Sequence, residues 1–494
     1  MKKRKEIIIS ASGFEKRVAI LEEGKLVEFY TEREERQSLV GRIYKGRVES
    51  VMKGLKSAFV NIGLPKNAFL PLSEVPFEEF LELYEPEVEM GPLPNIQKRK
   101  LTLREGQEVL CQIRKDPFSL KGPRVSSYIS LPGRYLVMML NTNRIGVSRR
   151  IKNPKSRERL WKILKEIKPK GIGFIARTAA EGASKDEIKE EARILEEEWK
   201  EIEAKAKREK APFLIYEGPD LIIKTIRDSF TTNVQNLFVD SQEEYNRILE
   251  YLRSTSPKLR SRVKLYKEDP PIFEAFGIEE GLSKALNRKV WLKSGGFITI
   301  DETEALTAID VNTGKFSSEE NFERMVFLTN LEAASEIARQ IRLRNLAGLI
   351  LIDFIDMKKR ENIQRVVAEF RKHLSEDKAK FDLTKVSEFG VLEMTRERVR
   401  PSLLSSLTEP CPCCDGKGRV LSKEEVVTKL ERFFYEKRKE LEGRRVELFL
   451  NPRVMGYLTI QKVAFLEHLA KKYKVGLKLR EDPDLPPSEF QVLL

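Results

Sequence analysis

The chain has 494 residues, of which 40% are hydrophobic and 34% charged, and its formal net charge is +14 at pH 7. The length predicts three or four domains, and the positive charge favours a polyanionic partner, nucleic acid before an acidic membrane surface. The absence of a run of ~18 apolar residues argues against a transmembrane helix, and the presence of only two histidines argues against a catalytic histidine base. The cysteines are too few for the disulfide scaffold of a secreted protein, so we expect a cytoplasmic protein.

The N-terminal third predicts β-structure. Residues 17–30 predict a hairpin, because two apolar runs flank a Glu-Glu-Gly-Lys turn. Short strands separated by glycines follow over 41–128 and predict a small closed barrel. Phe59 and Phe69 lie among lysines and arginines of this barrel. That combination is typical of proteins that stack the bases of single strands, although both rings could instead fill the barrel core.

Residues 173–179 predict a strand that ends in Arg177 and Thr178. A guanidinium beside a hydroxyl suits phosphate binding, but the pair alone is a weak signal. Ser184 and Glu187 predict a capping box at the start of a charged helix. Further on, the apolar run at 221–224 predicts a strand.

Two aspartates end apolar runs, Asp310 in 308–312 and Asp353 in 349–355. Both runs predict buried strands, where an ionised carboxylate is costly unless a positive group meets it. A shared divalent cation and simple backbone capping are both compatible with this pattern. The amphipathic helix between the strands, with a capping box at Ser317 and Glu320, predicts a βαβ-like unit.

Two weaker predictions concern the end of the chain. Asp356 is expected to cap a helix that begins near Met357. Residues 421–494 predict helices and one strand, at 446–450, without a chemical signature.

The Cys411-Pro412-Cys413-Cys414 segment predicts a metal site. Structural Zn²⁺ needs four ligands, and Cys111 and both histidines are distant in sequence. Cys411 and Cys414 supply one pair, which favours a zinc ion shared by two chains. A redox pair or a reactive thiol loop is the alternative.

Three stretches around the aspartates, 304–314, 329–334 and 348–357, are similar to the signature of the ribonuclease E/G family. The resemblance covers roughly residues 1–420, and the chain is most like the ribonuclease G branch, without a long disordered C-terminal tail. It implies a multidomain α/β fold. The expected parts are an RNase H-like domain (1–40 and 221–287), an S1 RNA-binding barrel (41–128), a 5′-sensor region (129–220), a DNase I-like catalytic subdomain (288–408), a zinc-link (409–420) and a small C-terminal α/β domain (421–494).

The resemblance also implies roles for individual residues. Asp310 and Asp353 would hold Mg²⁺, Asn312 would support them, and Lys380, where the family has arginine, would act at the scissile phosphate. The expected RNA contacts in the barrel are Phe59, Phe69, Lys115 and Lys121. The expected pocket for a 5′-monophosphate consists of Gly133, Val137, Arg149, Arg177 and Thr178. Cys411 and Cys414 match the zinc-binding pair of a homodimer, whereas Cys413 departs from the pattern.

These implications predict an Mg²⁺-dependent endoribonuclease that cleaves single-stranded RNA, leaves a 5′-phosphate and prefers 5′-monophosphorylated substrates. Its expected roles are rRNA processing and mRNA decay. A non-catalytic S1-domain RNA-binding regulator and a DNA nuclease are the alternatives.

Overall fold

The computed structural model describes residues 4–33, 38–52, 54–72, 88–90, 103–117, 121–140, 142–313 and 322–494. The chain forms two compact units, Met1–Leu404 and Ser405–Leu494. Within the described residues, no helix combines the length and the apolar composition needed to cross a membrane.

The first sheet joins the N-terminus to a segment more than 200 residues later. Its strand order is β16-β15-β1-β2-β3, and β1 pairs in parallel with β15. The predicted hairpin at 17–30 is confirmed as β2 and β3. The elements of this region are β1 (Lys5–Ser10), β2 (Glu15–Glu22), β3 (Lys25–Arg33), α4 (Leu221–Ser229), β15 (Val234–Val239), α5 (Gln242–Thr255), a 3-10 turn η3 (Pro257–Arg262), β16 (Val263–Leu265), α6 (Ile272–Ala275) and α7 (Ile278–Leu286).

The predicted strand at 221–224 is wrong, because these residues begin helix α4. The Asp220 side chain accepts a hydrogen bond from the Ile223 backbone N–H and caps the helix. Ile222, Ile223 and Ile226 then face the core at helical spacing. A four-residue apolar run does not by itself distinguish a strand from a helix turn.

The predicted closed barrel is confirmed. Five strands pair in the order β4-β5-β6-β9-β8, β4 also pairs with β8, and β14 extends the sheet beside β4. The resulting OB-like barrel encloses a small apolar core. Its strands are β4 (Ile43–Met52), β5 (Ser57–Asn61), β6 (Ala68–Pro71), β8 (Glu108–Lys115), β9 (Arg124–Ser126) and β14 (Phe213–Tyr216).

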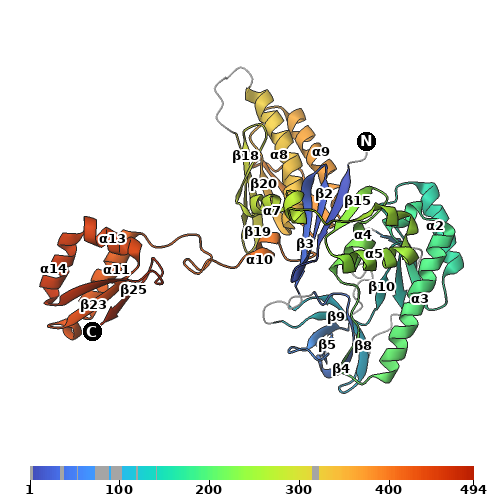
Figure 1. The fold of residues 1–494 in the computed structure, drawn as a ribbon, viewed down its shortest axis with the longest axis horizontal. Helices are drawn as coiled ribbons and strands as arrows, with labels where there is room; N and C mark the ends of the chain where they lie inside the picture. The colour runs from blue at the N-terminus through green and yellow to red at the C-terminus, as the bar shows by residue number, and fades with distance from the viewer. Residues whose placement is uncertain are drawn as a thin grey trace. The chain divides into compact units, whose positions relative to one another are not determined.

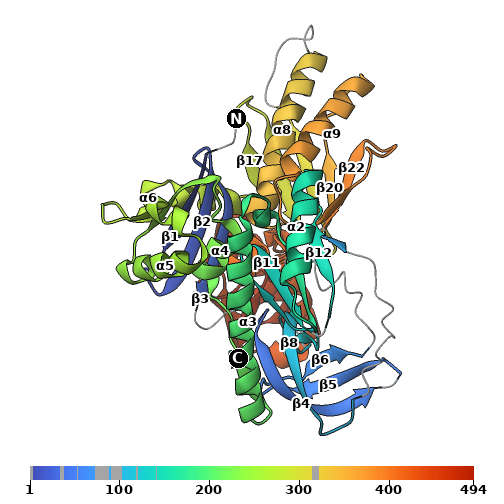
Figure 2. The same ribbon diagram turned by 90° about the vertical axis from the view of Figure 1, so that its right-hand side faces the viewer.

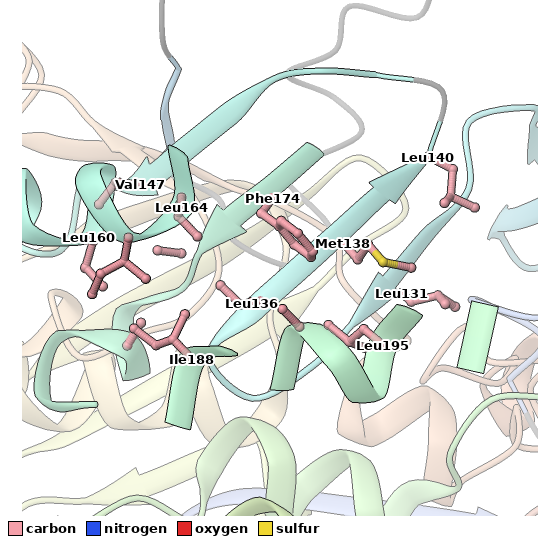
Figure 3. Packing of buried hydrophobic residues seen from close by; sticks show 14 of the residues in the cluster. Leu131, Leu136, Met138, Leu140, Val147, Leu160, Leu164, Phe174, Ile188 and Leu195 are labelled. Atoms are coloured by element: carbon pink, nitrogen blue, oxygen red, sulfur yellow. The ribbon is translucent and has the colours of Figure 1, made fainter. Parts of the chain in front are cut away.

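A third sheet, β10-β11-β13-β12-β7, packs against two helices. Figure 3 shows Leu136, Met138 and Phe174 of this sheet facing Leu160 and Leu164 of α2 and Ile188 and Leu195 of α3. The predicted capping box of Ser184 and Glu187 is present at the start of α3. The elements are β7 (Val88–Met90), β10 (Ser130–Pro132), β11 (Leu136–Leu140), β12 (Ile145–Ser148), α2 (Pro154–Ile167), β13 (Ile172–Ala176), η2 (Thr178–Gly182) and α3 (Lys185–Arg208).

The sheet that carries the aspartates has the order β17-β18-β19-β20-β22-β21, and helices α8 and α9 lie side by side along it (Figures 1 and 2). Strands β19 and β20 are parallel and joined through α8, as the βαβ-like pattern predicts. The predicted capping residues Ser317 and Glu320 lie outside the described residues. The elements are β17 (Lys289–Trp291), β18 (Phe297–Glu302), β19 (Leu306–Asn312), α8 (Phe322–Arg344), β20 (Gly348–Asp353), α9 (Arg360–Leu374), β21 (Phe381–Leu383), β22 (Val391–Arg396) and α10 (Leu403–Leu407).

The C-terminal unit has its own core and a three-stranded sheet, β24-β23-β25, where the sequence predicted a single strand. The two added strands are short and lie at the sheet edges, with alternating residues exposed. The elements are α11 (Lys423–Glu436), α12 (Arg438–Leu441), β23 (Arg445–Leu450), α13 (Pro452–Gln461), α14 (Val463–Tyr473), β24 (Gly476–Glu481) and β25 (Phe490–Leu493).

Candidate active site and nucleic-acid interface

Asp310 and Asp353 are register partners on the adjacent parallel strands β19 and β20. Directly paired residues project from the same face of a sheet, so the backbone alone brings the two carboxylates together. Asn312, two residues after Asp310 and therefore on the same face, donates from Nδ2 to Asp310 Oδ2 at 2.6 Å. The three residues that the sequence grouped together are thus neighbours.

The expectation that both aspartates lie inside buried strands is wrong. Only one face of the sheet is covered: Ile309, Ile350 and Ile352 face helices α8 and α9, whereas Asp310 and Asp353 are exposed. The apolar run of β20 hides this alternation, because it places leucines on the open face as well. The carboxylates can therefore ionise without the large desolvation penalty of a core position.

The negative charges nevertheless affect one another. Partial burial, the Asp310 carboxylate and the Asp356 carboxylate together raise the pKa of Asp353 above its usual range. Asp356 does not cap a helix as predicted, since α9 begins at Arg360 after Lys359, whose side chain makes no capping hydrogen bond. A cation held between the carboxylates would relieve this repulsion.

The donor set fits Mg²⁺. Carboxylate and amide oxygens are hard ligands, and Mg²⁺ commonly binds one or two carboxylates while waters and substrate phosphates complete its octahedron. In the described parts of the chain, no group of three or more His, Cys, Asp or Glu side chains is arranged to hold a metal.

Lys380 is not brought to the aspartates. Lys380 directly precedes β21, and its backbone carbonyl accepts a hydrogen bond from the Glu397 N–H. The residue before Glu397, Arg396, pairs with Gly348, the first residue of β20. Lys380 therefore lies level with the start of β20. Asp353 ends the same strand, five residues or about 17 Å away at ~3.3 Å per residue. The exposed Lys380 instead follows a loop whose Asp377 and Lys378 carbonyls accept from Arg150. The expected role at the scissile phosphate has no support in this geometry.

The barrel lines up four side chains across four strands. Phe59 pairs with Phe69, Phe69 with Arg124, and Arg124 with Lys115. The two rings are half-buried and meet edge to face, with centroids 5.9 Å apart. The rings neither fill the core nor stand free. Lys115, at the end of the row, and Lys121, three residues before Arg124, are exposed. Arg124, which the sequence reading missed, continues the row because of the strand pairing.

Arg177 is held on two sides. Its Nη1 donates to the Gly133 carbonyl at 2.7 Å and to Asp228 Oδ1 at 2.6 Å. Although burial opposes ionisation of Asp228, the charges of Arg227 and Arg177 keep its pKa far below the usual range. Asp228 was missed by the sequence reading because it lies 51 residues from Arg177.

The other expected pocket residues divide into two groups. Thr178 is exposed, and its hydroxyl lies 3.1 Å from that of Ser148, next to the exposed Arg149. Val137, by contrast, is buried in a small cluster with Met139 and Ile175. A bound ligand would meet Arg149, Arg177 and Thr178 before it met Val137.

Glu191 of α3 fixes the backbone that follows Gly133 in the expected 5′-phosphate pocket. Its carboxylate accepts from the backbone N–H groups of Arg134, Tyr135 and Leu136 at 2.6 to 2.7 Å. A Cβ at Gly133 would come within 2.7 Å of this carboxyl group, so a larger residue there would displace the Glu191 carboxylate from its three donors. Burial raises the pKa of Glu191 despite the three donors. Nothing in the sequence pattern separates this glutamate from the other acidic residues of α3.

The loop that carries the cysteines turns at two glycines. Gly416 and Gly418 have φ of +74° and +68°, and Gly418 N donates to Cys414 Sγ at 3.2 Å. Backbone N–H groups of Cys413 and Cys414 lower the pKa of the exposed Cys411 thiol. A thiol with a lowered pKa forms the thiolate, which is the form that binds metals such as Zn²⁺, more readily.

Comparison with known proteins extends these observations. A model of the ribonuclease E/G family matches residues 130–399, and a model named RNase E/G, Thioredoxin-like domain matches residues 410–493. Ribonuclease G of Escherichia coli K12 is 36% identical over 490 residues, which cover 99% of each chain. Ribonuclease G of Haemophilus influenzae is 37% identical over 92% of this chain and 91% of its own, and ribonuclease E of that organism is 34% identical over 99% of this chain and 52% of its own.

Proposed function

The chain belongs to the ribonuclease E/G family, and we propose that it is a metal-dependent endoribonuclease that hydrolyses single-stranded RNA. The observation that carries this proposal is the register pairing of Asp310 and Asp353 on an open sheet face, with Asn312 bonded to Asp310. The relatives are named as ribonucleases, and the charge of +14 suits a polyanionic substrate.

Asp310 and Asp353 would hold Mg²⁺ through their carboxylate oxygens, and Asn312 would keep the Asp310 carboxylate oriented by its hydrogen bond. When bound, Mg²⁺ lowers the pKa of a coordinated water and polarises the phosphate. Hydrolysis would form a bond between a water oxygen and phosphorus and break the bond from phosphorus to the 3′-oxygen, which would take up a proton released by that water. The products are a 5′-phosphate and a 3′-hydroxyl.

The barrel row of Phe59, Phe69 and Lys115, with Lys121, would hold the RNA by stacking and charge. Arg177 and Thr178, with Arg149 beside them and Gly133 behind, would bind a terminal 5′-monophosphate. Val137 would support this pocket from the core. The positive guanidinium of Arg177 would pair with a single terminal phosphate, whereas a triphosphate brings more negative charge toward the Asp228 carboxylate beside it.

Lys380 would contact the RNA backbone next to the loop whose Asp377 and Lys378 carbonyls accept from Arg150. Cys411 and Cys414 of each chain would share one Zn²⁺ in a homodimer. We further propose action in the cytoplasm, in rRNA processing and mRNA decay; the free thiols fit a reducing compartment.

The test uses one labelled single-stranded RNA and its DNA counterpart, each with and without Mg²⁺. We expect Mg²⁺-dependent cleavage of the RNA and fragments with 5′-phosphate and 3′-hydroxyl ends. Binding without cleavage would indicate an RNA-binding regulator, and equal cleavage of both substrates would indicate a general nuclease. Either result would contradict the proposal.

A further inference from the structure

The face that carries the aspartates also carries an aromatic pair. Two register rows cross the sheet there. One row runs Lys289, Thr299, Asp310, Asp353, Val391, and the adjacent row runs Trp291, Phe297, Asn312. Because paired residues share a face, Trp291 and Phe297 project on the same side as Asn312. Two strand spacings, about 10 Å, separate the backbone of Trp291 from that of Asn312.

The two rings form a defined surface. Trp291 and Phe297 meet edge to face with centroids 5.4 Å apart. Lys289 Nζ lies 4.1 Å from the Trp291 centroid and 3.4 Å from that of Phe297, so a cation fixes both rings. Arg288, which precedes Lys289, is hydrogen-bonded to Asp301 of β18 at 2.7 Å.

Trp291 is 66% exposed. The other two tryptophans, Trp161 and Trp199, are partly buried and pack against the core of the third sheet. Leaving a large aromatic side chain in water forfeits the free energy of its burial. The simplest alternative is that Trp291 only stabilises this edge strand. That role would not require the ring to lie on the same sheet face as Asp310 and Asp353 and to contact Lys289.

A second exposed ring lies on the other side of the aspartates. Phe389 is 92% exposed and belongs to the turn that enters β22. Two residues later, Val391 is the register partner of Asp353. The carboxylate pair is therefore flanked by Trp291 with Phe297 on one side and by Phe389 on the other.

We propose that Trp291, supported by Phe297 and Lys289, stacks one base of the RNA substrate near the scissile phosphate, and that Phe389 stacks a base on the opposite side of the cleaved bond. This inference rests on the proposed ribonuclease activity. Every base offers a π face, so the contact holds the strand across the sheet without reading its sequence. The adjacent lysine and arginine would meet the flanking phosphates.

The first experiment compares wild-type protein with Trp291→Ala, Trp291→Phe and the control Phe14→Ala, which removes a ring that is 86% exposed in the turn before β2. Stacking on an aromatic side chain contributes enough for roughly a 10-fold fall in kcat/KM in Trp291→Ala. Trp291→Phe should stay within about 3-fold of wild type, and Phe14→Ala should be unchanged.

The decisive measurement pairs each variant with RNAs in which one nucleotide near the cleavage site is abasic. The wild type should lose rate at one position on each side of the bond. Trp291→Ala should become insensitive to one of these positions, and Phe389→Ala to the other. A merely structural role would lower the rates on all substrates equally, and this pattern, or Trp291→Ala within 2-fold of wild type, would overturn the inference.

Fluorescence separates this inference from the proposed activity. In Trp161→Phe/Trp199→Phe protein carrying Asp310→Asn, Trp291 is the sole indole. Stacking should quench its emission on titration with a single-stranded oligoribonucleotide and less so with its abasic form. If wild-type protein fails to cleave RNA, the proposed function fails, whereas quenching still supports the stacking site and unchanged emission refutes it.

Discussion

The open face of the β19–β20 sheet and the Arg177 pocket use charge in opposite ways. Asp310 and Asp353 are exposed and placed by neighbouring backbone register. Arg177 is mostly buried, and its guanidinium is held by a carbonyl 44 residues away and a carboxylate 51 residues away. The exposed carboxylates are accessible to a ligand, whereas the Arg177 guanidinium already donates hydrogen bonds to a carbonyl and a carboxylate of the protein. An exposed carboxylate pair suits a catalytic site at which a metal ion and a substrate bind and leave. A fixed guanidinium suits a pocket that recognises a single anionic group.

The largest expected effect is loss of the carboxylate pair. Asp310→Asn or Asp353→Asn keeps the shape of the side chain but removes the charge that would hold Mg²⁺. Because metal assistance contributes several kcal/mol to the transition state, cleavage should fall by at least ~10³-fold while RNA affinity stays near wild type. Single-turnover cleavage at saturating Mg²⁺, with a binding assay as control, checks this. Near-normal turnover in either variant would rule out the two-aspartate site.

The second effect concerns the ion pairs that join helix α8, which packs on the β19–β20 sheet, to the N-terminal sheet. Arg342 at the end of α8 donates to Glu22 and Glu28 of the N-terminal sheet, both at 2.9 Å. Arg342→Met removes the main partner of Glu22 and leaves Lys378 as the remaining cation near Glu28, so it should destabilise the protein by about 3 kcal/mol in urea unfolding at pH 7. RNA cleavage and the preference for a 5′-monophosphate should both fall only in proportion to the fraction of unfolded protein.

This ion pair also sets a pH dependence. Burial opposes ionisation of Glu22, but Arg342 and Lys5 outweigh it and lower its pKa to about 2 from an ordinary value of 4.5. A depressed folded-state pKa stabilises the protein above about pH 4.5, and this contribution is lost as the pH falls toward 2. The stability gap between wild type and Arg342→Met should therefore narrow from pH 5 to pH 3. A gap that stays constant would show that the carboxylates are not coupled to Arg342.

These comparisons explain what could be predicted from the sequence. Asp310, Asn312 and Asp353 could be grouped because each lies in a short local pattern, yet their exposure could not, since the open face of β20 also carries leucines. The separation of Lys380 from Asp353 could not be predicted either, because strand register, which sets it, is absent from the linear pattern. Asp228 and Glu191 gain their roles from partners more than 50 residues away. Such contacts exist only after the chain has folded.

A smaller effect is expected in the pocket. Arg177→Ala removes the proposed charge-assisted hydrogen bonds to a terminal phosphate, which are worth roughly 10-fold or more in rate. The preference for 5′-monophosphate over 5′-hydroxyl RNA should vanish, while cleavage of 5′-hydroxyl RNA is unchanged. Arg177→Lys keeps the charge but loses the planar fork, and should show an intermediate preference. Equal rates on both RNAs with the wild-type protein would refute the sensor.

The smallest effect on either region should come from the cysteine loop, which belongs to the other compact unit. If two chains share one Zn²⁺, Cys411→Ser should release about half a zinc per chain and convert dimers to monomers, because two thiolates cannot complete a tetrahedral site. Cys413→Ser is the matched control and should keep both metal and dimer. Cleavage of a short RNA by the monomer should stay within a few-fold of wild type, since Asp310 and Asp353 come from one chain. Light scattering that shows intact dimers after complete zinc removal would exclude the shared site, and a Cys413→Ser variant that also loses zinc would assign the third thiol to the metal.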